Sequence, residues 1–311
     1  MLTFQVFRDF AGMRLDRFIQ RRIPRLSRAR AQRIIRDCAY TAEGRRRRPG
    51  EVVREGEVVL LVREGFEEPD VPTAFGVLHE DAAVVAVDKP AGLPVHRTAT
   101  YHRNTLGYLL RERYGDDEFV PRIAHRLDRE TSGVVLCARS AKAEREIKMG
   151  FEARRWHKRY LAIVHGQVED RGQVTRPLAP VTEGLHVMME LRDEGPAAET
   201  LYERLETRGA YSLVSLSPLT GRQHQLRVHM AAIGHPIVGD KLYGAEAEAP
   251  FLEHIETGMT PELLARLELP RQALHAHEVT FAHPDGGREM TITAPLPADL
   301  ADFWAQQASN A

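Results

Sequence analysis

The chain has 311 residues, of which 43% are hydrophobic and 28% charged, and its formal net charge at pH 7 is -1. This length and composition are those of a globular protein with a large core, which excludes a largely disordered chain. Cys38 and Cys137 stand far apart without a CxxC pair, which excludes a disulfide framework and a zinc finger. The N-terminus lacks a signal-peptide pattern and no apolar run reaches membrane-spanning length, so we expect a cytoplasmic protein without membrane contact.

The charge is distributed unevenly along the chain. The first 50 residues contain 14 arginines and four acidic residues, a net charge of +10, so the rest of the chain carries -11. A basic segment of this kind is typical of a surface that binds the phosphate backbone of nucleic acid. A solvated basic face without a partner is the alternative, and the patterned helices described next favour nucleic acid.

Two short helices are predicted in this basic segment. Apolar residues recur at helical spacing over residues 15–19, and Pro24 is expected to end that helix. Ser27 is suited to cap a second helix over residues 28–37, whose apolar stripe leaves most of its arginines on the exposed side. Short strands are expected at residues 38–42 and 58–62, around turn-rich sequence.

This layout is similar to the S4 RNA-binding domain. The matching residues are Arg-Leu-Asp at 14–16 and Ser-Arg-Ala-Arg-Ala-Gln at 27–32. The resemblance implies that RNA phosphates are bound by the second helix and the loop after it. Arginine suits this role because its planar guanidinium can form two hydrogen bonds to one phosphate. The candidate RNA-binding residues are Arg14, Arg28, Arg30 and Arg33.

An acidic, proline-containing segment at residues 64–73 predicts a linker between residues 1–63 and a larger domain at 74–311. In the larger domain the predicted strands outnumber the helices without strict alternation, which favours an α+β fold with a mixed, mainly antiparallel central sheet. The strands are expected at 84–87, 133–138, 160–165, 198–206, 211–216 and 276–281. The helices are expected at 105–114, 142–153 and 223–233, with a short one after residue 297.

A polar loop at residues 125–133, with the sequence His-Arg-Leu-Asp-Arg-Glu-Thr-Ser-Gly, places Asp128 between two arginines and before a buried strand. A carboxylate held in this way can act as a nucleophile, and a cationic partner would keep it ionised. Taken alone, the same pattern also fits an exposed arginine–aspartate pair, which is common and weak.

The loop resembles the catalytic loop of the RluA-type RNA pseudouridine synthases and matches it at every patterned position. Blocks at residues 87–96, 221–229 and 234–240 match the same family in the expected order. The resemblance implies the pseudouridine synthase fold for residues 74–311. It also implies a reaction that breaks the bond between ribose C1′ and uracil N1 and joins C1′ to C5, with no cofactor or metal.

The resemblance also assigns roles to individual residues. Asp128 is the nucleophile, although the sequence does not decide between attack at C1′, attack at C6 and assistance to elimination. Arg222 is expected to form a buried pair with Asp128, in a block where Gln223 replaces the commoner threonine. Leu226, four residues after Arg222, is expected on the same helix face as an apolar wall for the base.

Three further residues are expected at the site. Tyr160 matches the tyrosine of a Lys-x-Tyr block, and stacking on uracil is the role we expect for it, ahead of proton removal at C5. Arg126 is expected to fill the space of the extruded target base, with a structural salt bridge as the alternative. His125 and residues 131–133 are expected to shape the loop, where Gly133 permits a tight bend.

Other functions remain open at this point. The histidines at 224, 229, 275, 277 and 283 match no zinc motif, so we expect them to be structural. A non-catalytic S4-type RNA-binding protein would use the basic segment alone. An RNA N-glycosidase would need a second carboxylate to activate water, and Glu130 is the only close candidate in the sequence.

The expected partner is a structured RNA, ribosomal or transfer, recognised through its shape and phosphates. We expect a monomer that needs no obligate protein partner. The sequence identifies neither the RNA nor the modified uridine.

Overall fold

The computed structural model describes residues 2–23, 26–62, 68–98, 100–115, 119–185 and 187–307. Pro24 and the last four residues of the expected C-terminal helix lie outside the described residues. The chain divides into two compact units, Met1–Glu67 and Glu68–Ala311. Glu68 belongs to the second unit because its carboxylate accepts hydrogen bonds from the backbone N–H groups of Arg103 and Asn104.

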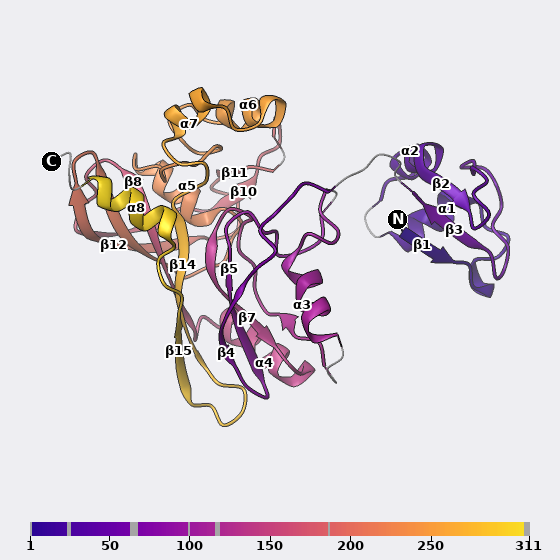
Figure 1. The fold of residues 1–311 in the computed structure, drawn as a ribbon, viewed down its shortest axis with the longest axis horizontal. Coiled ribbons are helices and arrows are strands. Elements are labelled where there is room, and N and C mark those ends of the chain that lie inside the picture. Colours follow the sequence, from indigo (N-terminus) through magenta and orange to yellow (C-terminus); the bar gives the residue numbers. More distant parts are fainter. Residues whose placement is uncertain are drawn as a thin grey trace. The chain divides into compact units, whose positions relative to one another are not determined.

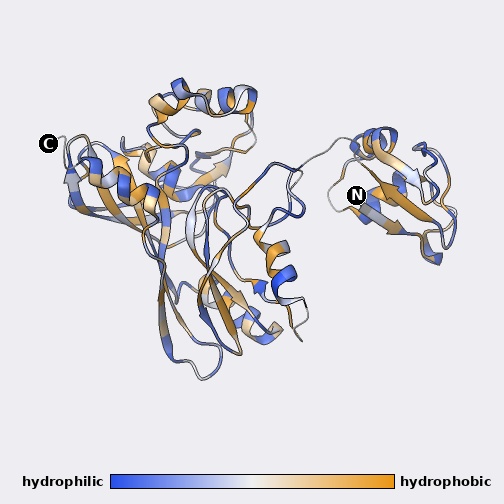
Figure 2. Ribbon diagram, in the orientation of Figure 1, coloured by the Kyte–Doolittle hydropathy of each residue, from blue (hydrophilic) through white to orange (hydrophobic). Residues whose placement is uncertain are grey.

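The first unit is an antiparallel sheet with two helices packed on it (Figure 1). Its strands lie in the order β1 (Leu2–Gln5), β3 (Val58–Leu61) and β2 (Ala39–Thr41). The helices are α1 (Leu15–Arg22) and α2 (Arg28–Cys38), and a short turn, η1 (Arg8–Phe10), precedes them. The apolar faces of both helices and the hydrophobic strand β3 form one core (Figure 2), so the spacing seen in the sequence predicted both helices correctly.

The second unit is built on one large sheet, drawn with its helices in Figure 1. Along the sheet lie β4 (Gly76–Glu80), β5 (Val84–Lys89), β7 (Ser132–Ala138), β14 (Leu274–Ala282), β8 (His157–His165), β13 (Tyr211–Pro218), β12 (Glu199–Arg208) and β9 (Arg171–Thr175). Two more strands, β6 (Arg122–Ile123) and β15 (Glu289–Thr293), pair with β7 and β14. The described pairs are antiparallel except for β7 with β14, which confirms the expected mixed, mainly antiparallel sheet.

The alternation of side chains along β5 explains how both faces of this sheet are covered. Val85 and Val87 belong to a core that includes α3 (Leu106–Tyr114), while Val84 and Ala86 belong to a second core with α4 (Ala141–Glu152). A strand buried on both faces reads as a continuous apolar run, which is why the sequence predicted it.

The remaining elements are a hairpin, β10 (Leu178–Pro180) with β11 (Met189–Leu191), and four helices. The helices are α5 (Gln225–Ala232), α6 (Ala249–Thr257), α7 (Pro261–Leu267) and α8 (Ala298–Gln307). The helix expected from residue 223 begins at Gln225 instead, because His224 has a left-handed backbone with φ of 55°. Helices α6 and α7 and strands β1, β4, β6, β9, β10, β11 and β15 were not predicted. In β9 and β15, polar residues interrupt the apolar pattern. No helix in the described part of the chain could cross a bilayer.

Gly133 allows the polar loop to enter β7 beside its parallel neighbour. Its φ is +111°, and a Cβ on this residue would lie 2.2 Å from the carbonyl oxygen of Ala276 in β14. A side chain at this position would both strain the backbone and force the two strands apart.

Replacing Gly133 with alanine should therefore lower the free energy of unfolding by about 3 kcal/mol, through strain and steric overlap together. Urea unfolding followed by circular dichroism measures this change. Gly221→Ala is the control, because a Cβ there meets no atom within 4 Å. Equal stability of the two variants would contradict this account of the loop.

Candidate active site

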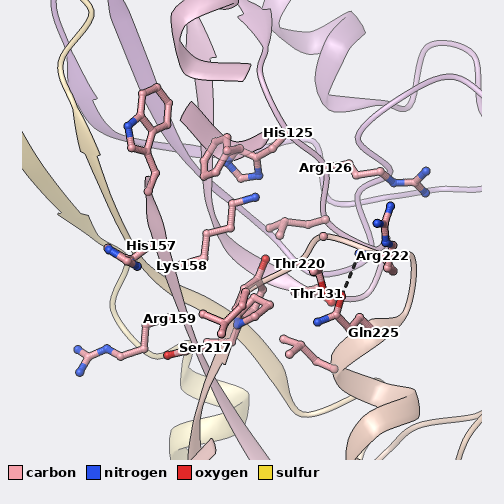
Figure 3. Close-up of a pocket in the computed structure, with 18 of the residues that line it drawn as sticks. His125, Arg126, Thr131, His157, Lys158, Arg159, Ser217, Thr220, Arg222 and Gln225 are labelled. Carbon is pink, nitrogen blue, oxygen red and sulfur yellow. Dashed lines mark hydrogen bonds between the residues drawn. The ribbon is translucent and has the colours of Figure 1, made fainter. Parts of the chain in front are cut away.

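Asp128 faces a pocket of about 990 Å³. The pocket is lined by the loop before β7, by the end of α4 with the start of β8, and by the turn from β13 into α5 (Figure 3). Residues of β12 and β14 complete its wall. A pocket of this size holds a ligand of several ring systems. The loop that carries Asp128 thus forms part of the wall of a large pocket.

The carboxylate of Asp128 lies against the guanidinium of Arg227, with Nη1 3.2 Å from Oδ2. The same guanidinium binds Asp240 through Nε and Nη2, at 2.6 and 2.7 Å, a bidentate geometry that fixes its plane. Burial opposes the ionisation of Asp240, but the charge and hydrogen bonds of Arg227 outweigh it and lower the pKa of Asp240. Arg227 is therefore held by one buried carboxylate and presented to the other.

Arg222 does not pair with Asp128, which corrects the expectation from the sequence. Its side chain is exposed at the edge of the pocket, and its Nε donates to the carbonyl oxygen of Ala197 at 3.1 Å. The reason is that Arg222 lies in the turn before α5, where its N–H donates to the Gln225 side chain (Figure 3). Arg227, within α5, forms the pair with Asp128 that was expected of Arg222.

Gln225 makes this turn rigid. Its side-chain oxygen accepts hydrogen bonds from the Arg222 N–H and the Thr220 hydroxyl, and its side-chain nitrogen donates to Glu199 and Thr200. All the hydrogen-bonding capacity of the buried amide is used, so its position is strongly specified.

His224 joins the site to a chain of hydrogen bonds that the sequence did not reveal. The Tyr243 hydroxyl accepts from the N–H of Met189 at 2.8 Å, and we assign its own O–H as the donor to Nδ1 of His224, also at 2.8 Å. Nε2 then carries the ring proton, 3.9 Å from Oδ2 of Asp128. Burial lowers the pKa of His224 to about 4, so the ring is neutral at neutral pH.

Tyr160 and Leu226 form the apolar part of the pocket. Both side chains are buried and both line the cavity. Burial and the charge of Asp128 raise the pKa of Tyr160, so its phenol keeps its proton at neutral pH. Leu226 lines the pocket, but it does not share a helix face with Arg222 as expected, because Arg222 precedes the helix.

Two buried lysines hold the loop that carries Asp128. Lys89 is fully buried, and its Nζ donates to the carbonyl oxygens of Pro90, Leu93 and Arg129. Burial lowers the pKa of Lys89 to about 7. Lys241 binds the next residue of the loop, with its Nζ 3.0 Å from both carboxylate oxygens of Glu130.

His125 and Arg126 have different surroundings. Nε2 of His125 accepts the N–H of Leu136, and its ring packs against Phe151, so this residue supports the loop. Burial lowers the pKa of His125 well below its ordinary value. Arg126 is exposed at the edge of the pocket, and no carboxylate pairs with it among the residues that the structure describes (Figure 3).

In the N-terminal unit, the four candidate arginines fall into two pairs. Arg14 and Arg28 bind the buried carboxylate of Asp16, at 2.9 and 3.4 Å, and the hydrogen bond from Arg14 is the main reason that the pKa of Asp16 is lowered. Arg30 and Arg33 are exposed on α2. Arg30 and Arg33 are thus available to a ligand, while Arg14 and Arg28 also stabilise the unit.

Two of the histidines weighed as metal ligands, His229 and His275, form hydrogen bonds within the fold. His229 uses its two ring nitrogens on Thr200 and the carbonyl oxygen of Arg176, and His275 uses its two on Ser132 and the carbonyl oxygen of Ala294. Within the described residues, no group of three or more acidic, histidine or cysteine side chains is arranged to hold a metal ion.

Four residues of this site were missed by sequence reasoning: Arg227, Asp240, His224 and Tyr243. The first three lie inside the matched blocks, so the motifs contained a signal. Their partners are brought together only by the fold, because Asp128 and Arg227 are far apart in the chain.

Residues 83–232 match the family model described as RNA pseudouridylate synthase. The chain is 37% identical to "Ribosomal large subunit pseudouridine synthase D" of Xanthomonas campestris, over 93% of this chain and 87% of that one. It is 38% identical to "Uncharacterized RNA pseudouridine synthase" of Chloroflexus aurantiacus, over 92% and 87%. A solved structure, "Human RNA Pseudouridylate Synthase Domain Containing 4", matches 75% of this chain and 93% of its own, with 26% identity and a TM-score of 0.59.

The hydrogen-bond chain through His224 can be tested by nitrogen-15 NMR of the imidazole. We expect Nε2 to be protonated and Nδ1 unprotonated at pH 7, with the ring becoming charged only near pH 4. In Tyr243→Phe the neutral ring loses its donor to Nδ1, so the pKa of His224 should rise toward its ordinary value. A proton on Nδ1 in the wild type would contradict the assignment.

Proposed function

Because the chain belongs to the RNA pseudouridine synthases, we propose that it isomerises uridines in the RNA of the large ribosomal subunit. The family relationship extends over nearly the whole chain, and the similar protein of Xanthomonas campestris is named for that substrate. One observation carries the assignment of the site: Asp128 opens into the pocket while Arg227, fixed by Asp240, holds its other side. A ribosomal substrate implies that the enzyme acts in the cytoplasm.

Asp128 is the group that acts on the target nucleotide. The reaction separates C1′ from N1 and joins C1′ to C5, so it needs a charged group beside the sugar and a surface that retains the free base. Arg227 holds Asp128 in one orientation, and pre-orientation of this kind removes part of the cost of reaching the transition state.

Tyr160 and Leu226 provide the surface for the base. A neutral phenol ring and a leucine side chain hold uracil by stacking and contact, which lets the base turn between the cleavage and joining steps. The raised pKa of Tyr160 disfavours a phenolate at neutral pH, so stacking is the better role.

Arg126 is placed for base extrusion. Its side chain is exposed at the edge of the pocket, two residues from Asp128. An arginine there can enter the RNA stack as the uridine leaves it, because its planar guanidinium stacks on bases. The structural salt bridge considered as an alternative lacks a carboxylate partner in the described part of the chain.

An N-glycosidase is disfavoured by the position of Glu130. Its carboxylate is bound by Lys241 and Arg129, and it is absent from the described wall of the pocket. A second carboxylate that activates water must face the substrate. A purely RNA-binding role is disfavoured because the chain belongs to a family of enzymes and retains both Asp128 and Tyr160.

The N-terminal unit has the helices and sheet expected of an S4-like RNA-binding domain, and we assign it that role. Arg30 and Arg33 on α2 provide the exposed charge, and Arg14 and Arg28 lie beside them on Asp16. We propose that the protein acts as a monomer.

Variants at the two arginines of the α5 block test the site. Asp128→Asn should reduce pseudouridine formation at least about 10³-fold, and Arg227→Lys about 10²-fold, because one ammonium cannot hold both carboxylates. Arg222→Ala should cost less than about 10-fold. Single-turnover rates on ribosomal RNA, with mass spectrometry of the nucleosides, measure all three. An equal loss in Arg222→Ala and Arg227→Lys would contradict the corrected pairing, and free uracil would favour the glycosidase.

The role of the N-terminal unit can be tested by the salt dependence of RNA binding. Each phosphate contact contributes about one unit to the slope of log affinity against log salt. We expect the slope to fall by about two in the double variant Arg30→Gln with Arg33→Gln. Arg288→Gln, at an exposed arginine of the second unit, is the control and should leave the slope unchanged. An unchanged slope in the double variant would remove Arg30 and Arg33 from the RNA surface.

A further inference from the structure

Lys158 points into the pocket from the same strand face as Tyr160. The two residues are separated by one position on β8, so their side chains lie on one side of the sheet, roughly 6.6 Å apart along the strand. Figure 3 shows the Lys158 side chain running toward His125, while His157 and Arg159 point the other way. A second group therefore faces the ligand beside the base-stacking tyrosine.

The Lys158 ammonium has an aromatic setting. Nζ lies 3.9 Å from the centre of the Phe151 ring, and its charge contributes to the lowered pKa of His125. Burial lowers the pKa of Lys158 itself to about 8, so the amine is largely charged at neutral pH. Contact with a phenyl ring compensates only part of the lost hydration of an ammonium.

Several other cations along this pocket pair with carboxylates, and the two that do not within the described part of the chain, Arg126 and Arg222, are exposed to solvent at its edge. Lys148 pairs with Glu144 at 2.7 Å, Arg159 with Glu278 at 3.2 Å, and Arg227 with its two aspartates. Lys158 has no carboxylate within ion-pair distance among the residues that the structure describes. A partly buried cation without an anion is costly, and a bound anion removes that cost.

We propose that the Lys158 ammonium binds a phosphate of the RNA backbone next to the target uridine. The inference rests on the proposed function, which supplies the ligand. With uracil against Tyr160, the sugar and its phosphates occupy the adjoining part of the pocket, which has room for them. The Lys158 ammonium has three N–H donors on a flexible side chain, so it can bind a phosphodiester in more than one orientation. Lys158 is then the group that fixes the sugar relative to Asp128.

The test combines a protein variant with a neutralised phosphate. A methylphosphonate replaces the phosphate on the 5′ or the 3′ side of the target uridine in a stem–loop substrate, and kcat and KM are measured for each RNA. One of the two replacements should raise the wild-type KM about 10-fold, the usual effect of losing one charge-assisted hydrogen bond. In Lys158→Met the KM on ordinary RNA should be about 10-fold higher already, and the same replacement should have less than a twofold effect.

Lys148→Met is the matched control, since Lys148 lies on the same pocket but has a carboxylate partner. It should respond to the methylphosphonate as the wild type does, and Lys158→Arg should recover most of the affinity. Equal sensitivity of wild type and Lys158→Met to both replacements would overturn the proposal, as would a wild type insensitive to both. Thermal melting checks that Lys158→Met is folded, and Lys158→Gln replaces it in the same cycle otherwise.

Failure of the proposed function is distinguishable from failure of the phosphate contact. The proposed function is wrong if the wild type forms no pseudouridine in unmodified ribosomal RNA. The phosphate contact is still measurable then, as equilibrium binding of the same RNAs to Asp128→Asn and to Asp128→Asn with Lys158→Met. A loss of affinity that depends on both the methylphosphonate and Lys158 supports the contact. Independent effects overturn it.

Discussion

The contact between Arg227 and two carboxylates is the interaction on which the site depends. Asp240 takes two of its nitrogens and leaves the third for Asp128, so the position of the reactive carboxylate is set by a residue that never meets the substrate. A buried ion pair contributes little stability by itself, but removing one member leaves an uncompensated charge. The arrangement therefore serves geometry more than stability, and it couples the first turn of α5 to the loop before β7.

The loop itself is held by polar contacts as well as by the apolar packing of Leu127 and His125. Lys89 collects three carbonyl oxygens, Lys241 binds Glu130, and Gly133 permits the close approach of β7 to β14. Polar loops cannot rely on hydrophobic burial alone to stay in place, so buried charged donors share that task. Lys89, Lys241 and Glu130 therefore lie near the pocket but hold the loop in place and do not line the pocket.

Burial divides the ionisable groups of the pocket into neutral and charged ones. His224, His125 and Tyr160 are kept neutral at neutral pH by their surroundings, while Asp128 is stabilised by Arg227. The charge that meets the RNA is thereby limited to a few groups, among them the carboxylate and the proposed phosphate-binding lysine. Neutral rings beside them offer stacking and directed hydrogen bonds without attracting or repelling the phosphate backbone.

The sequence by itself determined the elements with a strong apolar period, such as α1, α2 and β5, because periodic burial is a local property of the chain. It also determined the family, through motifs that place Asp128, Tyr160 and Leu226. The prediction that Arg222 pairs with Asp128 was wrong. The left-handed backbone of His224 delays the start of α5 to Gln225, so Arg222 lies in the preceding turn and binds Ala197 instead, which only the fold shows. The tertiary structure alone decided the Asp240–Arg227–Asp128 bridge and the burial of Lys158, because both join segments whose separation in the chain leaves no local trace.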